Sequence, residues 1–94
     1  MGWIIDVDHD ADKTAKAPSN ANAVGMIGPR AYKGDGSELH NKFRMLTDDR
    51  EVVYEGRSGD NSDFGPLDDF GQPNYGCTII QYWQAGPGGG WKDL

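Results

Sequence analysis

The first chemical pattern in the sequence is a run of aspartates at every second position, Asp6, Asp8, Asp10 and Asp12. On a strand, alternate side chains point to the same face, so these four carboxylates would gather there and attract a cation. A calcium-binding EF-hand loop requires Gly at its sixth position and Glu at its twelfth. Counted from Asp6, those positions hold Ala11 and Ala17. We therefore predict a solvated acidic loop and no metal site, with cation binding as the alternative.

The other reactive side chains are the two histidines, His9 and His40, and the single cysteine, Cys77. Their spacing matches no zinc motif. A lone cysteine at the beginning of a strand is typically a small buried apolar residue, which leaves a Cys77–His40 hydrolase as a third, less favoured hypothesis. The sequence also lacks the G-x-S-x-G serine motif and the phosphate-binding glycine motifs. We predict no catalytic residues and no cofactor, and we expect recognition rather than turnover.

The segment 57–76 is the candidate binding site. It follows a predicted hairpin, has no periodicity of its own, and is longer than most connections in a small domain. Its aromatic residues, prolines and glycines favour a long ordered loop, and ordered loops on a sheet often carry binding residues. The adjacent Asp68 and Asp69 favour local turn hydrogen bonds, with Asp69 kept as a candidate contact. The predicted ligand-binding residues are Phe64, Asp69, Phe70, Tyr75 and Trp83.

Charge and composition limit the partners. The 94 residues carry a formal net charge of −6, which disfavours direct binding to a nucleic-acid backbone. Only 36% of the residues are hydrophobic and 14 are glycine, a composition typical of short strands and turns around a small core. A small core favours additional burial between subunits, so we expect a homo-oligomer with a small-molecule or protein partner.

The expected location is cytoplasmic. One cysteine cannot form an intrachain disulfide, which fits a reducing compartment. The first residues show no basic stretch followed by an apolar one, so we expect no signal peptide. The apolar runs are far shorter than a membrane span, so we expect no membrane partner.

Hydrophobic alternation predicts a mainly β protein. Residues 3–8 form the first expected strand, with Trp3, Ile5 and Val7 on one face. Residues 8–23 contain no bulky apolar side chain and are expected to form a loop or arm. Short strands are expected within 24–29, at 77–83 and at 91–94. The strand at 77–83 is apolar on both faces, which is typical of a central strand covered on both sides.

The segment 42–56 predicts a β-hairpin around Asp48, Asp49 and Arg50. With a two-residue turn at Asp49 and Arg50, the strands align in one register. That register places Leu46 opposite Val53, Met45 opposite Tyr54 and Arg44 opposite Glu55, the last as an ion pair, with Phe43, Met45, Val52 and Tyr54 on one face. A longer loop is the alternative, because neither turn residue is Gly. The predicted fold is one small domain over 1–94, a curved, half-barrel-like antiparallel meander of five or six short strands with little helix.

Three segments together resemble a known group of proteins: AVGMIGPR (23–30), KFRMLTDDREVVYEG (42–56) and PLDDFGQPNYGCTIIQYW (66–83). The chain resembles, over residues 3–83, small uncharacterised bacterial proteins carried on mobile DNA, such as integron gene cassettes and phage-like elements. The run Pro-Leu-Asp-Asp-Phe-Gly is the most specific part of the resemblance. The resemblance implies no particular activity.

Two functions are compatible with these features. The first is a non-enzymatic binding module with its site in the aromatic and acidic 57–76 loop, for which a homo-oligomer interface is one location considered. The alternative is an acidic inhibitor made by a mobile element, which presents aspartates of 6–12 and 60–69 as a DNA-like surface to a nucleic-acid-binding host protein. Such a mimic requires its carboxylates on one face, and its binding should weaken steeply with salt.

Overall fold

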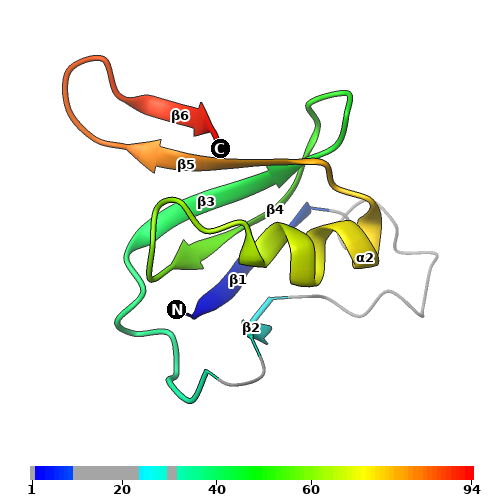
Figure 1. The fold of residues 1–94 in the computed structure, drawn as a ribbon, viewed down its shortest axis with the longest axis vertical. Helices are drawn as coiled ribbons and strands as arrows, with labels where there is room; N and C mark the ends of the chain where they lie inside the picture. Colours follow the sequence, from blue (N-terminus) through cyan, green and yellow to red (C-terminus); the bar gives the residue numbers. More distant parts are fainter. Residues whose placement is uncertain (1, 10–23, 30–31) are drawn as a thin grey trace.

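The computed structural model describes residues 2–9, 24–29 and 32–94. In these residues the chain forms a six-stranded antiparallel sheet and one short helical segment, which confirms the mainly β class (Figure 1). The strands are β1 (Trp3–Asp8), β2 (Ile27–Gly28), β3 (Asn41–Leu46), β4 (Val52–Ser58), β5 (Ile79–Gln84) and β6 (Gly90–Asp93). Their order in the sheet is β2-β1-β4-β3-β5-β6.

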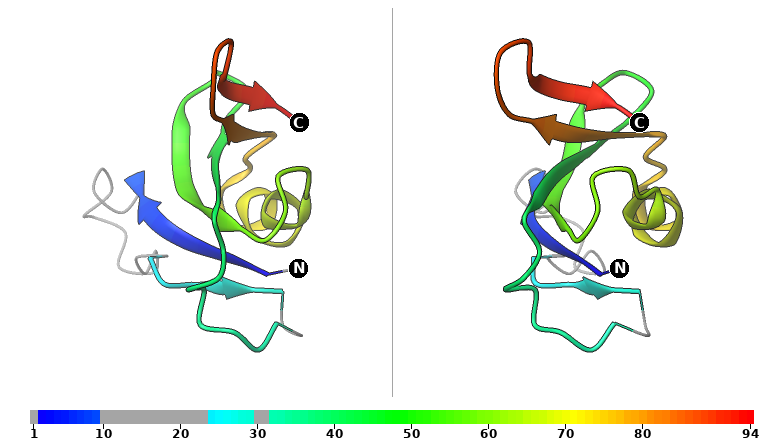
Figure 2. Two further views of the ribbon diagram at one scale, coloured as in Figure 1. Left: turned by 90° about the vertical axis from the view of Figure 1, so that its left-hand side faces the viewer. Right: turned by 60° about the vertical axis from the view of Figure 1, so that its left-hand side comes forward.

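The sheet curves around the helical segment, which lies against one of its faces (Figure 2). We call this the inner face and the opposite one the outer face. The chain crosses the inner face between β4 and β5, two strands separated in the sheet by β3. The connection that carries the helical segment therefore covers the centre of the sheet.

The helical segment was not anticipated in the long ordered loop predicted at 57–76. It consists of the π-helical turn η1 (Leu67–Gly71) and the short helix α2 (Gln72–Tyr75). Pro73 lacks an N–H, and its ring would clash with the carbonyl four residues earlier in a regular α-helix, so a wider turn just before it is favourable. Gly76 ends the segment in a left-handed conformation, φ +84°, and its N–H donates to the Gln72 carbonyl at 2.8 Å.

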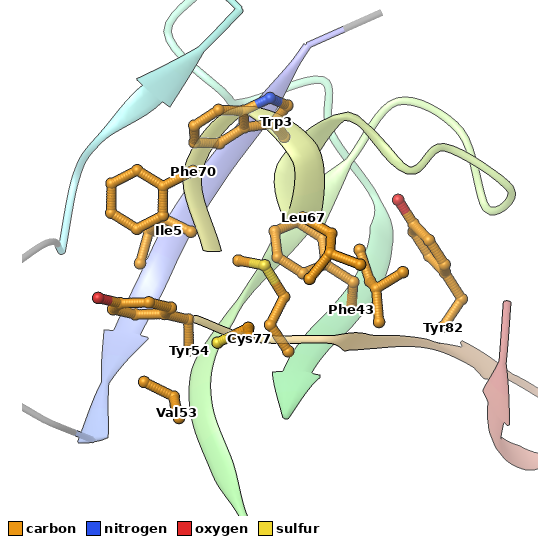
Figure 3. Close-up of a cluster of buried hydrophobic side chains, with 11 residues drawn as sticks. Trp3, Ile5, Phe43, Val53, Tyr54, Leu67, Phe70, Cys77 and Tyr82 are labelled. Carbon is orange, nitrogen blue, oxygen red and sulfur yellow. The ribbon is translucent and has the colours of Figure 1, made fainter. Parts of the chain in front are cut away.

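The core lies between the inner face and this helical segment (Figure 3). Phe70 connects the two, because its ring centroid is 5.0 Å from that of Tyr54 and 5.7 Å from that of Trp3. Tyr82 packs edge-on against Phe43, with centroids 5.9 Å apart. The buried cluster comprises Trp3, Ile5, Phe43, Met45, Val53, Tyr54, Leu67, Phe70, Cys77, Ile80 and Tyr82.

A β-bulge in β1 corrects the predicted face of Val7. The pairing with β4 shifts between Ile5 and Val7, so that Asp6 is an extra residue in the ladder. Trp3 and Ile5 are buried as expected, but Val7 is exposed. The extra residue reverses the alternation, so Val7 leaves the inner face and Asp8 is buried in its place.

A second bulge corrects the register of the β3–β4 hairpin. Arg44 lies opposite Glu55 and Met45 opposite Tyr54, as predicted, but Leu46 pairs with Val52. Val53 is the extra residue and joins the core, while Val52 is only half-buried. The same-face prediction was therefore wrong for Val52.

The turn of this hairpin is the longer alternative. The Arg50 N–H donates to the Thr47 carbonyl at 2.9 Å, and the Thr47 N–H donates to the Glu51 carbonyl at 3.0 Å. Arg50 has φ +62°, the left-handed conformation that the third residue of such a loop adopts. The predicted register failed near the turn because it assumed two loop residues.

The remaining expected strands form with shifted ends. β5 begins at Ile79, and the expectation that this strand is covered on both faces is not met within the described chain, because Trp83 is exposed. A short strand lies within 24–29 as β2, and the last strand is the edge strand β6. β5 lies between β3 and β6, with Ile80 and Tyr82 buried and Trp83 exposed. The arm predicted at 8–23 falls outside the described residues from position 10 onwards.

Candidate functional site

The outer face carries a row of polar side chains across four strands. The backbone register aligns Glu55 of β4, Arg44 of β3, Gln81 of β5 and Asp93 of β6. Gln81 is the centre of this row and is only 4% exposed. Its amide oxygen accepts a hydrogen bond from Arg44 Nε at 2.6 Å, and its Nε2 donates to Asp93 Oδ1 at 2.5 Å. A buried amide with both ends bonded holds its neighbours in one arrangement.

Two tryptophans lie beside this row. Trp83 of β5 is directly opposite Trp91 of β6, and their ring centroids are 5.4 Å apart with an interplanar angle of 69°. The guanidinium carbon of Arg44 lies 4.5 Å from the centroid of the Trp91 ring, a cation–π contact. Gln81 therefore orients Arg44, Arg44 supports Trp91, and Trp91 supports Trp83. Trp83 itself remains 45% exposed.

Most of the other charges on this face are paired. Arg57 donates from Nε and Nη2 to the two carboxylate oxygens of Asp6, at 2.8 and 3.0 Å, and this pairing raises the pKa of Arg57. His9 Nε2 lies 2.5 Å from Glu55 Oε2. Arg50 contacts both carboxylate oxygens of Asp93, and its hydrogen bonds lower the pKa of that carboxyl group.

The predicted Arg44–Glu55 ion pair is replaced by these contacts. The two residues are opposite each other, but Arg44 donates to Gln81 and Glu55 contacts His9. The Arg44 guanidinium instead donates through Nε to the Gln81 amide oxygen and packs on the Trp91 indole, two contacts that a planar guanidinium can make together. The outcome is a ladder of contacts toward β6.

Among the residues that the structure describes, two recesses adjoin the tryptophan pair. The larger, about 690 Å³, lies where β3 begins and β5 ends, and its walls are His40, Asn41, Lys42, Asn61, Trp83, Gln84 and Ala85. The smaller, about 250 Å³, is lined by Asp6, Val7, Lys42, Phe43, Glu55, Gly56, Arg57 and Trp91. Lys42 belongs to both. The larger recess has volume within the range of small-molecule sites and contains no carboxylate.

The residues predicted to bind a ligand lie in different places. Phe70 is 7% exposed and belongs to the core. Phe64 and Tyr75 are exposed at the two ends of the helical segment, and Asp69 is exposed on η1. Trp83 follows the buried core residue Tyr82 along β5, so its side chain is on the outer face, on the other side of the sheet from that segment. The structure does not gather the five residues, but it brings Asn61 of the 57–76 segment into the recess of Trp83.

The carboxylates required by the DNA-mimic alternative are also dispersed where they are described. Asp6 is paired with Arg57 on the outer face and Asp8 is buried, while Asp68 and Asp69 belong to the segment over the inner face. Asp10 and Asp12 lie outside the described residues. Within the described ranges no group of three or more metal-ligating side chains occurs.

Cys77 and His40, the pair considered for a hydrolase, belong to different environments. Cys77 is fully buried in the core beneath Gly71, and this burial raises the pKa of its thiol to about 11. A thiol with so high a pKa forms very little thiolate near neutral pH. His40 is exposed and lines the recess of Trp83 instead. The geometry therefore gives no support to a thiol nucleophile.

Sequence reasoning missed several residues of the recess, above all Asn41, Lys42, Asn61 and Gln84. The available signal was the prediction that Trp83 faces away from Ile80 and Tyr82, which identifies the correct face. The neighbours of Trp83 depend on the pairing of β3 with β5, and no local pattern specifies that pairing.

Comparisons with known proteins add no assignment. No protein-family model, no curated protein and no solved structure matches this chain. None of the helices in the described ranges has the length and apolar character needed to cross a membrane. A functional proposal therefore depends on the geometry of the outer face.

Proposed function

We propose that the chain is a non-enzymatic binding module whose ligand contacts the outer face of the sheet at Trp83. One observation carries the proposal: a half-exposed indole is held in a fixed position beside a recess of about 690 Å³. Large exposed aromatic side chains next to concave surfaces are common in recognition sites. The 57–76 segment contributes Asn61 to this site, and its aromatic residue Phe70 supports the fold.

The contacts behind Trp83 favour recognition by a preorganised surface. Trp91 packs against the ring, Arg44 packs against Trp91, and buried Gln81 fixes Arg44. A binding residue held by its neighbours loses little side-chain entropy when the ligand arrives. Mobile surface aromatics have no such support.

Nuclear magnetic resonance of the three indole N–H groups tests the proposal. A ligand at the outer face should shift the signals of Trp83 and Trp91 and leave that of buried Trp3 unchanged. The probes are neutral sugars, nucleosides and nucleotides, amino acids and aromatic acids, added one class at a time. The backbone amide signals are recorded in the same spectra, and a ligand that shifts only those of residues 64–75 would show that the site is at the helical segment. If every class leaves Trp83 unshifted, the proposal is wrong.

The acidic inhibitor remains the second hypothesis with less support, because Asp6 is already neutralised by Arg57 and Asp8 is buried. The salt dependence of binding distinguishes the acidic inhibitor from the binding module, since binding through unpaired carboxylates weakens strongly as ionic strength rises. The proposal also retains a homo-oligomer and a cytoplasmic location. The single Cys77, a buried free thiol, is compatible with a reducing compartment, and the mass in solution tests the oligomer.

A further inference from the structure

We infer that the ligand of the larger recess is a neutral carbohydrate whose ring packs on Trp83. This inference rests on the proposed function and names the ligand class for the same site. It depends on three properties of the recess: a flat apolar wall, a set of amide side chains, and a low formal charge.

The apolar wall is the indole of Trp83. The ring is 45% exposed, and Trp91 is packed against it at 69°. A pyranose ring presents a face of C–H groups, slightly positive, which matches the negative face of an indole. The contact requires a ring that stays in place when the sugar binds, and the Gln81–Arg44–Trp91 series of contacts provides it.

The polar wall consists of amides. Asn41 at the start of β3, Asn61 from the 57–76 segment and Gln84 at the end of β5 line the same recess. An amide offers both donors and acceptors, so it can serve a hydroxyl group in either role. Asn41 is already oriented, because its Nδ2 donates to the Ser58 carbonyl at 3.1 Å. Asn41 and Gln84 alternate with Lys42 and Trp83 along their strands, so these two amides line the side of the recess toward the inner face and Trp83 lines the side toward the outer face. A ligand with many hydroxyl groups on an apolar ring can contact both sides.

The charge of the recess argues against an anionic ligand. Among its seven lining residues, Lys42 alone carries a permanent charge. Arg44 is directed to Gln81 and Trp91, and Arg57 is paired with Asp6. A nucleotide or a nucleic-acid strand could also stack on Trp83, but phosphate binding requires several available cations, and the chain as a whole has charge −6. A neutral ligand meets no such requirement.

The experiment is a titration of the full chain with neutral mono- and disaccharides of the gluco, galacto and manno series, followed by tryptophan fluorescence and the indole N–H signals. We expect at least one sugar to shift Trp83 with millimolar or tighter affinity. Affinity should stay nearly constant between about 0.05 and about 0.5 M salt, because no ionic contact is lost. Nucleotides, added at the same concentrations, serve as the competing ligand class.

Variants locate the sugar. Trp83→Ala should weaken binding at least about tenfold, as for loss of a central aromatic contact, and Trp83→Tyr should restore part of it. Asn61→Ala, in an exposed turn, should weaken binding severalfold without affecting the fold. Phe64→Ala is the matched control, because Phe64 is an exposed aromatic (46%) outside the recess, and it should leave affinity unchanged.

Three outcomes overturn the inference, and they separate it from the proposed function. If nucleotides shift Trp83 in a salt-dependent way and sugars do not, the site is real but its ligand is anionic. If Trp83→Ala leaves sugar affinity unchanged, the sugar binds elsewhere. If neither class, nor any other, shifts Trp83, both the carbohydrate inference and the binding site on the outer face are wrong.

Discussion

The inner and outer faces of the same sheet both carry aromatic side chains, but the surroundings of these side chains differ. On the inner face, Phe43 and Tyr82 pack edge-on within the core and are fully or almost fully buried. On the outer face, Trp83 and Trp91 also pack edge-on, but their support is a ladder of polar contacts and Trp83 remains half-exposed. Similar aromatic pairs therefore serve two purposes: the inner one stabilises the fold, and the outer one presents a surface.

The comparison has an energetic consequence. Apolar area removed from water contributes to the free energy of folding, whereas area that stays exposed is available for binding. Substitutions on the inner face should mainly change stability, and substitutions at Trp83 should mainly change affinity.

The largest effect is expected for Phe70→Ala. Phe70 contacts Trp3 and Tyr54, and its truncation leaves a cavity between the sheet and the helical segment. We expect a loss of about 3–5 kcal/mol in the free energy of unfolding, measured with urea. Phe64→Ala, at an exposed aromatic of the same segment, should cost less than about 1 kcal/mol. If the Phe70→Ala protein is stable but no longer binds sugar, Phe70 contacts the ligand, as the sequence analysis predicted.

Alkaline pH should weaken the inner face selectively. Burial raises the pKa of Cys77 to about 11 and that of Tyr82 to about 12. In the unfolded chain the thiol loses its proton at about pH 8.5 and the phenol at about pH 10. At pH values between the unfolded-state pKa and the folded-state pKa of each group, the unfolded state binds fewer protons than the folded state. The free energy of unfolding therefore falls as the pH rises. We expect each group to contribute a loss of about 3 kcal/mol once the pH passes its folded pKa, since one pKa unit corresponds to about 1.4 kcal/mol.

The control for this pH effect is Cys77→Ala. Its urea midpoint should be lower at pH 7, because a core side chain is shortened, but should decline less between pH 9 and pH 11. An identical decline in both proteins would mean that the thiol does not contribute. Labelling of Cys77 with a thiol reagent should be slow in the folded protein at pH 8 and should accelerate in urea.

The inner face was easier to predict from the sequence than the outer one. Alternation identified β1 and β5, and it correctly assigned Ile80 and Tyr82 to the face opposite Trp83. Alternation failed at Val7 and Val52, because a bulge adds one residue to a strand without any local marker in the sequence. The alternation of apolar residues therefore predicts which side chains are buried only in the parts of a strand that contain no β-bulge.

The helical segment and the recess were harder to predict. Pro66 and Pro73 predict a loop, although Leu67 and Phe70, three residues apart, carry a weak helical signal. Both prolines are accommodated, at the start of η1 and in the first turn of α2. The recess joins Asn61 to Trp83 through the path of the chain across the sheet, which no sequence pattern encodes.

Gly71→Ala should have an intermediate effect on the inner face. A Cβ built at Gly71 would lie 2.4 Å from Met45 Sδ and 3.3 Å from Cys77 Cβ, so either the buried Met45 side chain or the helical segment would have to shift. Overpacking of this kind costs about 1–3 kcal/mol. In the double variant with Met45→Ala the contact with Sδ is removed. The sum of the stability losses of the two single variants should therefore exceed the loss measured for the double variant. Additive losses would show that Gly71 is required for another reason.

The smallest effect on stability is expected for Trp83→Ala. The side chain is half-exposed, and its main recorded contact is the edge-on pair with Trp91, an arrangement that contributes about 0.5–1.5 kcal/mol. We therefore expect a loss of about 1 kcal/mol in urea unfolding, well below that for Phe70→Ala, alongside the tenfold loss of sugar affinity. If Trp83→Ala is as destabilising as Phe70→Ala, the outer tryptophans are a second core, and the ring is not free to receive a ligand. A small loss of stability with a large loss of affinity would instead show that the outer face keeps its aromatic surface for recognition.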